Sequence, residues 1–375
     1  MALPHPICSR SLPQSCDSFT VGNGWTLLTR PDAPTEILET THGLRSNASL
    51  NNRVGAQPSH SNTKVTQMTS QPPTINAEVV QVADNAYAYV QDDGSWFINN
   101  TGFVIGPDGV ILIDTSSTEA RTRAFLDAVA VITDAPIHAV VNTHHHGDHT
   151  HGNYLTAPAP IISHRLCKDI VEKAGIDHYP TAFEQPNWGN LELRAPTITF
   201  KTRMDLWAGD TIVELHTMGD VAHTTNDVVA WLPTEGVLYT GDLVFHGGTP
   251  FVLMGSVQGS IDALDVLRGF GAETVVPGHG KVTGPQVFDD IERYLSMILD
   301  VATAAHSAGK TPLDAARGVE LGDFASLTDS ERLVGNLYRA MAEIDGPEAN
   351  ANMSIAAAIG DMITFHGGPL LPCSA

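Results

Sequence analysis

Hydrophobic and polar residues follow regular short periods only beyond about residue 75. Ser46–Gln71 reads SNASLNNRVGAQPSHSNTKVTQMTSQ and is rich in Ser, Asn, Gln and Thr. Such a segment has too few apolar side chains to offset the entropy lost on ordering. We therefore expect residues 1–70 to be a disordered extension. Met68 opens a sequence that reads like a natural N-terminus, so we interpret the residues before it as a misassigned start or a cloning remnant.

Beyond residue 75, segments that favour strands alternate with segments at helical spacing. Val, Ile and aromatic residues between turn sequences such as GPDG indicate strands, and apolar residues three and four positions apart indicate helices. The expected strands are Glu78–Ala83, Tyr87–Gln91, Trp96–Ile105, Val110–Asp114, Ile137–Asn142, Pro160–Ser163, Thr211–His216, Asp227–Leu232, Val237–Tyr239 and Glu273–Val276. The expected helices are Thr118–Val131, Ser260–Phe270 and Pro285–His306, followed by a mostly helical tail to about residue 366. This alternation predicts an α/β fold.

The composition is that of an acidic globular protein. The 375 residues include 20 Lys and Arg against 42 Asp and Glu, a formal net charge of −22, and 42% are hydrophobic. The first 68 residues contain five basic and four acidic side chains, so all of the excess negative charge lies beyond them. Because affinity for polyphosphate comes from Lys and Arg, we expect no nucleic-acid partner. No apolar run approaches the ~20 residues of a membrane span, so we expect no membrane partner either.

The cysteines give no sign of a disulfide framework. Cys8, Cys16, Cys167 and Cys373 form no CxxC pair and have no regular spacing, which also argues against a cysteine zinc site. The opening residues MALPHPICSRSLPQSC lack the basic and apolar regions of a secretory signal. We therefore expect a cytoplasmic protein, and the sequence leaves its oligomeric state open.

Ligand-type side chains cluster directly after one of the buried strands. The sequence THHHGDHTHGN places His144, His146, Asp148 and His149 within six positions. Imidazole and carboxylate suit zinc, and a tight loop at a strand end can direct alternate side chains toward one point. These four groups are expected to converge on a metal. His145, between two such positions, is expected to point away.

Three more ligand-type residues follow later strands. They are His223 in the sequence AHT, Asp242 in TGDL and His279 in VPGHG. Together with the histidine loop they make seven ligands, more than one tetrahedral zinc ion can use, whereas two ions that share a bridging carboxylate need about that number. The count predicts two zinc ions per chain.

Five segments resemble the motifs of a known family. ILIDTS, THHHGDHTHGN, AHT, TGDLVF and VPGHG are similar, in this order, to the motifs of the metallo-β-lactamase superfamily over about residues 76–285. The resemblance implies a four-layer αββα sandwich with the metals at one edge between the sheets, and a structural role for Asp114 beneath the histidine loop. The implied ligands are His144, His146 and His223 for the first metal, Asp148, His149 and His279 for the second, and Asp242 as the bridge. The expected domains are the disordered extension (1–70), the metallo-β-lactamase-fold domain (71–285) and a helical C-terminal extension (286–375).

The expected chemistry is hydrolysis. Two metals lower the pKa of a bridging water, so that hydroxide is available near neutral pH to attack a carbonyl, phosphoryl or sulfuryl centre. Asp148 is the candidate catalytic residue, because it lies beside that solvent and can pass a proton to the leaving group. The substrate class is a small-molecule ester, lactone, thioester, lactam or sulfate ester. Candidate pocket residues are His246 and Phe251, which follow the TGDL motif, and Trp96 in the early β region.

Other functions of the same fold stay open. The HxHxDH segment is similar to that of the glyoxalase II type, which cleaves a thioester, but the C-terminal helices show no matching basic pattern for glutathione. A persulfide dioxygenase would use a single iron, and its RGCGR-like segment is replaced here by LVFHGGTPFVLMGS. The non-enzymatic alternative is a binding module that keeps metal for structure, although structural sites need only four ligands.

Removing residues 1–67, so that the chain begins at Met68, is expected to leave the melting temperature and the metal content unchanged. The reason is that this segment shows no hydrophobic periodicity. Thermal unfolding and metal analysis of the two forms test the expectation. A clearly lower melting temperature in the shortened protein would mean that the segment packs on the fold.

Overall fold

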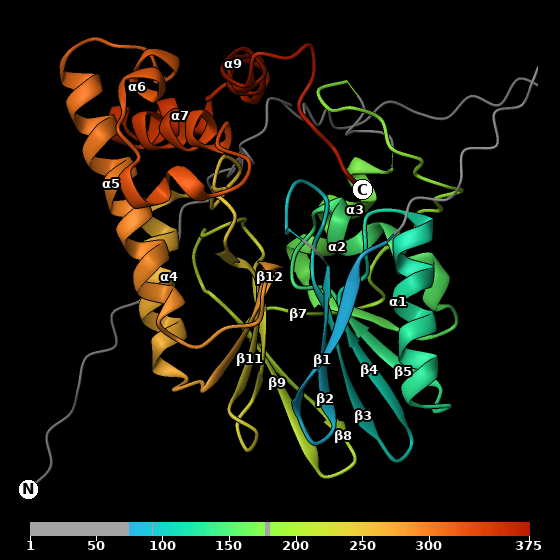
Figure 1. Cartoon of the computed structure of the whole chain (residues 1–375). Coiled ribbons are helices and arrows are strands. Elements are labelled where there is room, and N and C mark those ends of the chain that lie inside the picture. Colours follow the sequence, from blue (N-terminus) through green and yellow to red (C-terminus); the bar gives the residue numbers. More distant parts are fainter. Residues whose placement is uncertain (1–74, 92, 177–180) are drawn as a thin grey trace, which may run out of the picture. The chain divides into compact units, whose positions relative to one another are not determined.

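Two β-sheets packed face to face form the centre of the part of the chain that the computed structural model describes, residues 75–375 without 92 and 177–180 (Figure 1). The seven-stranded sheet comprises, in spatial order, β1 (Ala77–Ala83), β2 (Ala86–Gln91), β3 (Thr101–Gly106), β4 (Gly109–Ile113), β5 (Ile137–Val141), β6 (Ile161–His164) and β7 (Ile198–Phe200). The five-stranded sheet comprises β12 (Thr274–Gly280), β11 (Val237–His246), β10 (Val228–Leu232), β9 (Thr211–Thr217) and β8 (Arg203–Ala208). Residues 75–375 belong to one compact unit. The expected extension over residues 1–70 lies outside the described residues.

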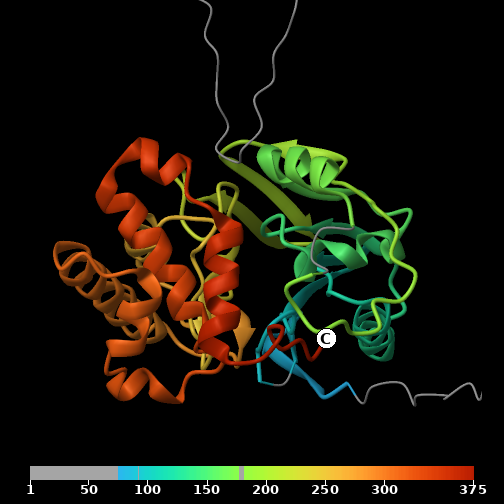
Figure 2. The same ribbon diagram turned by 90° about the horizontal axis from the view of Figure 1, so that it is seen from above.

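Helices cover the outer face of each sheet. On the first sheet they are α1 (Glu119–Ile132) and α3 (Arg165–Ala174), whereas the short helix α2 (Gly147–Thr150) belongs to the segment that follows β5. On the second they are α4 (Val257–Gly269) and α5 (Val287–Ser307). The C-terminal helices α6 (Pro312–Gly318), α7 (Arg332–Asp345), α8 (Pro347–Ala351) and α9 (Ile355–His366) gather on the side of the second sheet (Figure 2). The expected four-layer αββα sandwich with C-terminal helices is confirmed.

In β3 and β4, apolar side chains point alternately to the two faces of the first sheet, toward the helix layer and toward the second sheet. Phe103 and Leu112 pack outward against Phe125 of α1, whereas Val104 and Ile113 pack inward against the second sheet. Successive side chains of a strand point to opposite faces. Each of these strands therefore contributes to two hydrophobic layers at once.

Parallel pairing directs several chain segments to one edge of the sandwich. β4, β5, β6 and β7 are parallel to one another, and β11 is parallel to β12. Parallel neighbours end on the same side, so the segments that follow β4 and β5 lie together. In the second sheet β11 and β12 extend to His246 and Gly280, beyond the expected ends at Tyr239 and Val276.

The expected strand Trp96–Ile105 is wrong in its first half, because β3 begins only at Thr101. Trp96 and Phe97 lie in a turn, and Phe97 has a positive φ of 64°. Both aromatic side chains are buried in the hydrophobic cluster that the C-terminal helices complete. Tertiary packing, not pairing with a neighbouring strand, thus places these aromatic residues.

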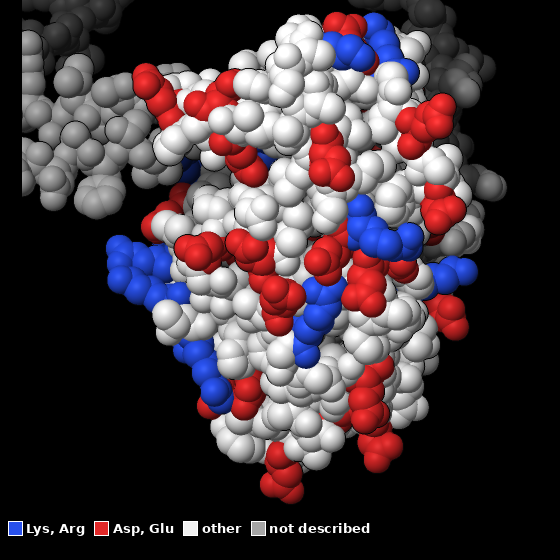
Figure 3. All heavy atoms as spheres, turned by 90° about the vertical axis from the view of Figure 1, so that its left-hand side faces the viewer, with Lys and Arg blue, Asp and Glu red and all other residues white. Residues whose placement is uncertain are grey.

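The outer face of α4 and α5 carries interspersed acidic and basic side chains (Figure 3). Arg268 of α4 pairs with Asp289 and Glu292 of α5, and Arg293 pairs with Asp290. Exposed pairs of this kind contribute at most about 1 kcal/mol each. In the described part of the chain, no helix combines the length and apolar character needed to cross a membrane.

Gly102→Ala is expected to lower the free energy of unfolding by ~1–3 kcal/mol through overpacking. A Cβ at this position would lie 2.3 Å from Cε1 of Tyr239, a buried ring between the sheets. Urea unfolding measures the change. Gly269→Ala is the control, because nothing lies within 4 Å of its Cβ position, and equal stability of the two variants would contradict this account of sheet packing.

Candidate metal centre

Among the described residues, two groups of His and Asp side chains meet at the edge where these strands end. The first group is His144, His146, His223 and Asp242, and the second is Asp148, His149, Asp242 and His279. In each group the donor atoms lie within 4.8 Å of one another. All seven residues expected from the sequence are therefore brought together, and Asp242 belongs to both groups.

The first group is built from three imidazoles that face one another. Nδ1 of His146 lies 3.0 Å from Nε2 of His144 and 3.0 Å from Nε2 of His223. Oδ2 of Asp242 lies 3.8 Å and 3.5 Å from the same two Nε2 atoms. His144 and His146 come from the loop after β5, His223 from the loop after β9, and Asp242 from β11. Three nitrogens and one oxygen thus surround one point.

The second group combines two imidazoles with two carboxylates. Nε2 of His279 lies 3.3 Å from Oδ2 of Asp148 and 3.4 Å from Oδ2 of Asp242. Nε2 of His149 lies 3.1 Å from Oδ1 of Asp242. The Oδ2 atom of Asp242 therefore faces ligand nitrogens of both groups, which is the position required of a bridging carboxylate.

Asp114 supports the histidine loop from below. Its Oδ1 accepts a hydrogen bond from the backbone N–H of Thr143 at 2.7 Å, and its Oδ2 accepts one from the Thr143 hydroxyl at 2.7 Å. Nδ1 of His149 lies 2.8 Å from the same Oδ2. When Nδ1 of a histidine donates to a carboxylate, Nε2 is left for a metal, and the ring orientation is fixed. These contacts agree with the structural role that the resemblance implies for Asp114.

The other ligand rings are oriented by oxygen atoms behind them. Nδ1 of His144 lies 3.1 Å from the Thr143 hydroxyl. Nδ1 of His223 lies 2.6 Å from the carbonyl oxygen of Phe251, and Nδ1 of His279 lies 3.1 Å from that of Gly94. Each of these three rings therefore directs its Nε2 toward the centre. Thr224, next to His223 in the sequence, bonds to Asp227 and not to a ligand ring.

The metallo-β-lactamase superfamily model matches residues 94–279, the segment that carries all seven of these residues. The chain belongs to the metallo-β-lactamase superfamily. It is 25% identical over 265 residues to a linear primary-alkylsulfatase of Pseudomonas, covering 57% of this chain and 48% of the relative. It is 27% identical over 228 residues to the alpha subunit of a 2,4-dinitroanisole O-demethylase of Nocardioides, covering 59% and 62%.

The alignments leave part of each of these relatives unmatched. The chain spans about half of the alkylsulfatase and less than two thirds of the demethylase subunit. Among solved structures, a metallo-β-lactamase from Pontibacter korlensis is similar with a TM-score of 0.49 and 19% identity, covering 59% of this chain and 99% of that one.

Charge distribution divides the ligands of this metallo-β-lactamase-fold centre into two kinds. Burial lowers the pKa of His144 and of His146 well below the usual histidine value, which keeps the neutral form that binds metals. Burial acts in the same direction on His279, but the carboxylates of Asp242 and Asp148 outweigh it and raise its pKa to about 9. His144 and His146 thus favour the neutral form, whereas the neighbouring carboxylates stabilise the protonated form of His279.

Two orphaned atoms test whether metal cations fit these groups. Nε2 of His149 and Oδ1 of Asp242 are buried and lie 3.1 Å apart, but neither makes a hydrogen bond of good geometry, to the other or to any further group in the described part of the protein. Leaving such atoms without a partner is costly, and a cation between them would satisfy both. Nitrogen and carboxylate donors of this kind suit zinc and related divalent metals. The residues present therefore fit bound metal.

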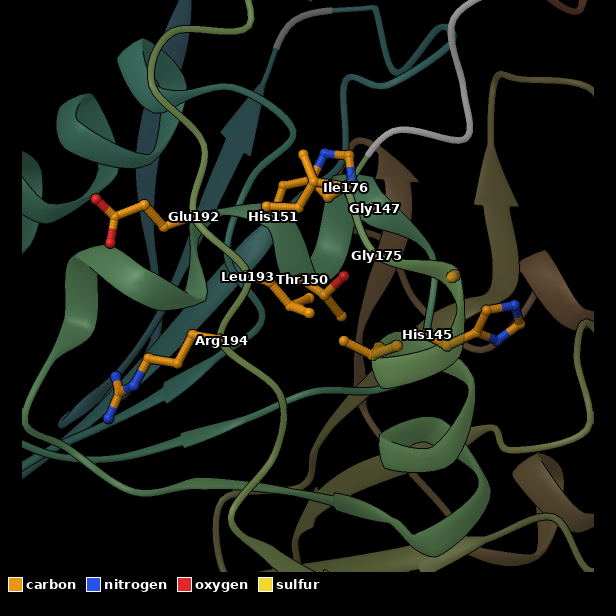
Figure 4. A pocket seen from close by; sticks show the side chains of 11 residues that line it. His145, Gly147, Thr150, His151, Gly175, Ile176, Glu192, Leu193 and Arg194 are labelled. Atoms are coloured by element: carbon orange, nitrogen blue, oxygen red, sulfur yellow. The ribbon is translucent and has the colours of Figure 1, made fainter. Parts of the chain in front are cut away.

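His145 is directed elsewhere. Its Nδ1 lies 2.9 Å from the side-chain amide nitrogen of Asn226. It lines a separate small pocket together with Thr150 and Arg194, and none of the seven ligands lines that pocket (Figure 4). This placement agrees with the expectation that the middle histidine of the loop does not face the metal.

A cavity of about 300 Å³ opens onto the ligand groups. His146 and His223 of the first group line it, as do Asp148, His279 and the shared Asp242. Of the three pocket candidates from the sequence, Trp96 and Phe251 line the cavity and His246 does not. The structure places His246 outside this cavity, with its Nδ1 2.8 Å from the carbonyl oxygen of Lys281.

Asp242→Ala is expected to lower metal occupancy at both groups, because one carboxylate faces both. His279→Ala should leave about one metal ion per chain, since the first group keeps its ligands. Metal analysis after zinc reconstitution and dialysis measures both. His145→Ala is the control and should keep normal metal content. If it loses metal as His146→Ala does, the assignment of the alternate histidines is mistaken.

Proposed function

We propose that the protein is a zinc-dependent hydrolase that binds two zinc ions and cleaves a small-molecule ester, lactone, thioester, lactam or sulfate ester. The observation that carries the proposal is that the cavity exposes ligands of both groups together with the shared Asp242. A centre that served only to hold the fold together would have no need of such access, because structural metal sites are closed. A small molecule in the cavity would lie directly against the centre.

The metals would supply two kinds of help when bound: polarisation of the oxygen under attack, and acidification of water. The protein's own part begins with orientation. Asp114 and Thr143 hold the histidine loop, and the carbonyl of Gly94 holds His279. A preorganised site avoids the cost of rearranging during the reaction.

Asp148 is the side chain we assign to proton transfer. It lines the cavity, and its side chain remains 11% exposed, more than that of His149 or Asp242 beside it. Burial alone would raise the pKa of Asp148, but His149 and His279 lower it well below the usual value. It is therefore an ionised carboxylate at neutral pH, the form that can accept a hydrogen bond from the attacking water and orient it, and once protonated it would readily give the proton to the leaving group.

The named relatives support hydrolysis without selecting the bond. One is named for alkyl sulfates and another for demethylation of dinitroanisole. One kind of metal site serves different reactions in proteins of one fold. A panel of chromogenic lactones, thioesters, cephalosporins and sulfate esters, tested with the zinc-loaded protein, identifies the bond. No turnover on any of them, or a single iron with dioxygenase activity, would contradict the proposal.

Asp148→Asn is expected to reduce turnover by about 10²-fold or more, because an amide cannot accept the proton from water. Metal content should be measured in the same samples, so that lost turnover is separated from lost metal. In ¹⁸O-water the wild-type protein should place the label in the released product in a single turnover, with no covalent protein intermediate. A trapped acyl-protein, or full activity of Asp148→Asn at normal metal content, would show that another residue performs this step.

A further inference from the structure

Away from the metal ligands, hydrocarbon side chains from distant parts of the sequence close the cavity. Trp96 and Phe251 meet edge to face with ring centroids 4.9 Å apart. Ile355 and Ile359, one turn apart on α9, line the same cavity and remain partly exposed. Isoleucine side chains that keep part of their surface accessible next to aromatic rings offer contact to an apolar ligand. This wall, formed by Trp96, Phe251, Ile355 and Ile359, is called the apolar wall below.

Trp96 is held in place by two consecutive residues at the start of α7, Glu331 and Arg332. The indole Nε1–H donates to Oε1 of Glu331 at 2.6 Å. The guanidinium carbon of Arg332 lies 4.1 Å from the centre of the indole ring, within the range of a cation–π contact. Trp96 is thus fixed both at its polar edge and on one face. Its ring is a rigid surface, which costs a ligand little ordering entropy.

Arg332 also lines the cavity. Among the described residues that do so, it is the charged one outside the two His/Asp groups. Its side chain is only 1% exposed. One terminal nitrogen lies 2.7 Å from Oδ2 of Asp329, and the other donates to the carbonyl of Thr249 at 3.0 Å. The carboxylate of Asp329 thus lies against the charge of Arg332, and the guanidinium lies on the face of Trp96, while its buried Nε makes no hydrogen bond within the described residues.

From this arrangement we propose that the substrate carries an uncharged hydrocarbon group, and that this group binds between Trp96 and α9 while the reacting bond lies at the metal centre. The second part of this statement rests on the proposed function. The first part rests on the apolar wall alone. A cavity of about 300 Å³ is small for a ligand site, so the hydrocarbon group has a limited length.

The test uses a homologous series of linear 1-alkanesulfonates and the zinc-reconstituted full chain. These compounds have no bond that the proposed reaction cleaves, so calorimetric titration measures binding without turnover. Affinity is expected to rise about fourfold per added methylene group, the gain for burying one CH₂, and to stop rising when the cavity is filled. Affinity that is independent of chain length, or no binding at any length, would overturn the proposal.

A second series examines the far end of the ligand. Alkane-α,ω-disulfonates carry a charge where the proposal places hydrocarbon, so they should bind at least about tenfold more weakly than monosulfonates of equal length, because burying an unpaired charge is costly. Tighter binding of the disulfonates would show that Arg332 recognises an anion and that the apolar assignment is wrong.

Substitutions on α9 locate the site. Ile359→Trp should fill part of the cavity and lower affinity for the longest chains by about tenfold, with little effect on the shortest. Ile355→Trp provides a second variant should the first fold poorly, and melting temperature and metal content identify folded protein. Ile344→Trp is the matched control, because Ile344 lies on α7, is 41% exposed and does not line the cavity. Equal chain-length profiles for Ile359→Trp and Ile344→Trp would place the hydrocarbon group elsewhere.

The two proposals fail separately. Chain-length dependence without turnover on any member of the substrate panel would leave the apolar site in place and remove the hydrolase. Turnover without chain-length dependence would support the hydrolase and contradict the apolar site.

Discussion

The buried carboxylate of Asp114 is the contact on which the centre depends most. It follows β4, and its hydrogen bonds reach the loop after β5 and the imidazole of His149 on α2. Burial raises the pKa of Asp114, and contacts with His149 and Thr143 counteract that cost in part. Its backbone adopts a positive φ of 63°, uncommon for a residue other than glycine. The loop after β5 and the helix α2, which carry four of the seven residues, are therefore held by one side chain.

The convergence of the seven His and Asp residues could be predicted from the sequence because they stand in short motifs next to strands. The THHHGDH loop follows β5, and Asp242 and His279 lie in the last parts of β11 and β12, so the pairing of parallel strands is enough to bring them to one edge. The cavity lining was predicted less well, because residues that line it do not all stand next to these motifs. His246 follows the TGDL motif closely in sequence, but its side chain leaves the centre, whereas Ile359 reaches the cavity from more than a hundred residues further along.

Weak local signals account for the two strands, β7 and β8, that the sequence analysis missed. β8 alternates exposed and half-buried positions, and its Trp207 is 61% exposed, so no apolar face marks it as a strand. β7 has only three residues. Both are defined by pairing with neighbours, β7 with β6 and β8 with β9, and such pairing is not visible in a local pattern.

The turn that contains Gly94 and Trp96 belongs to two environments at once. The carbonyl of Gly94 orients His279, and the indole of Trp96, two residues later, forms part of the apolar wall. A Cβ on Gly94 would lie 2.5 Å from the backbone nitrogen of Gly280, and Gly94 has a positive φ of 64°, so this backbone has little room to adjust. A substitution that displaces Trp96 is therefore expected to displace the carbonyl of Gly94 as well, and with it the imidazole of His279. Selection for a new cavity shape at this position acts on the geometry of the centre as well.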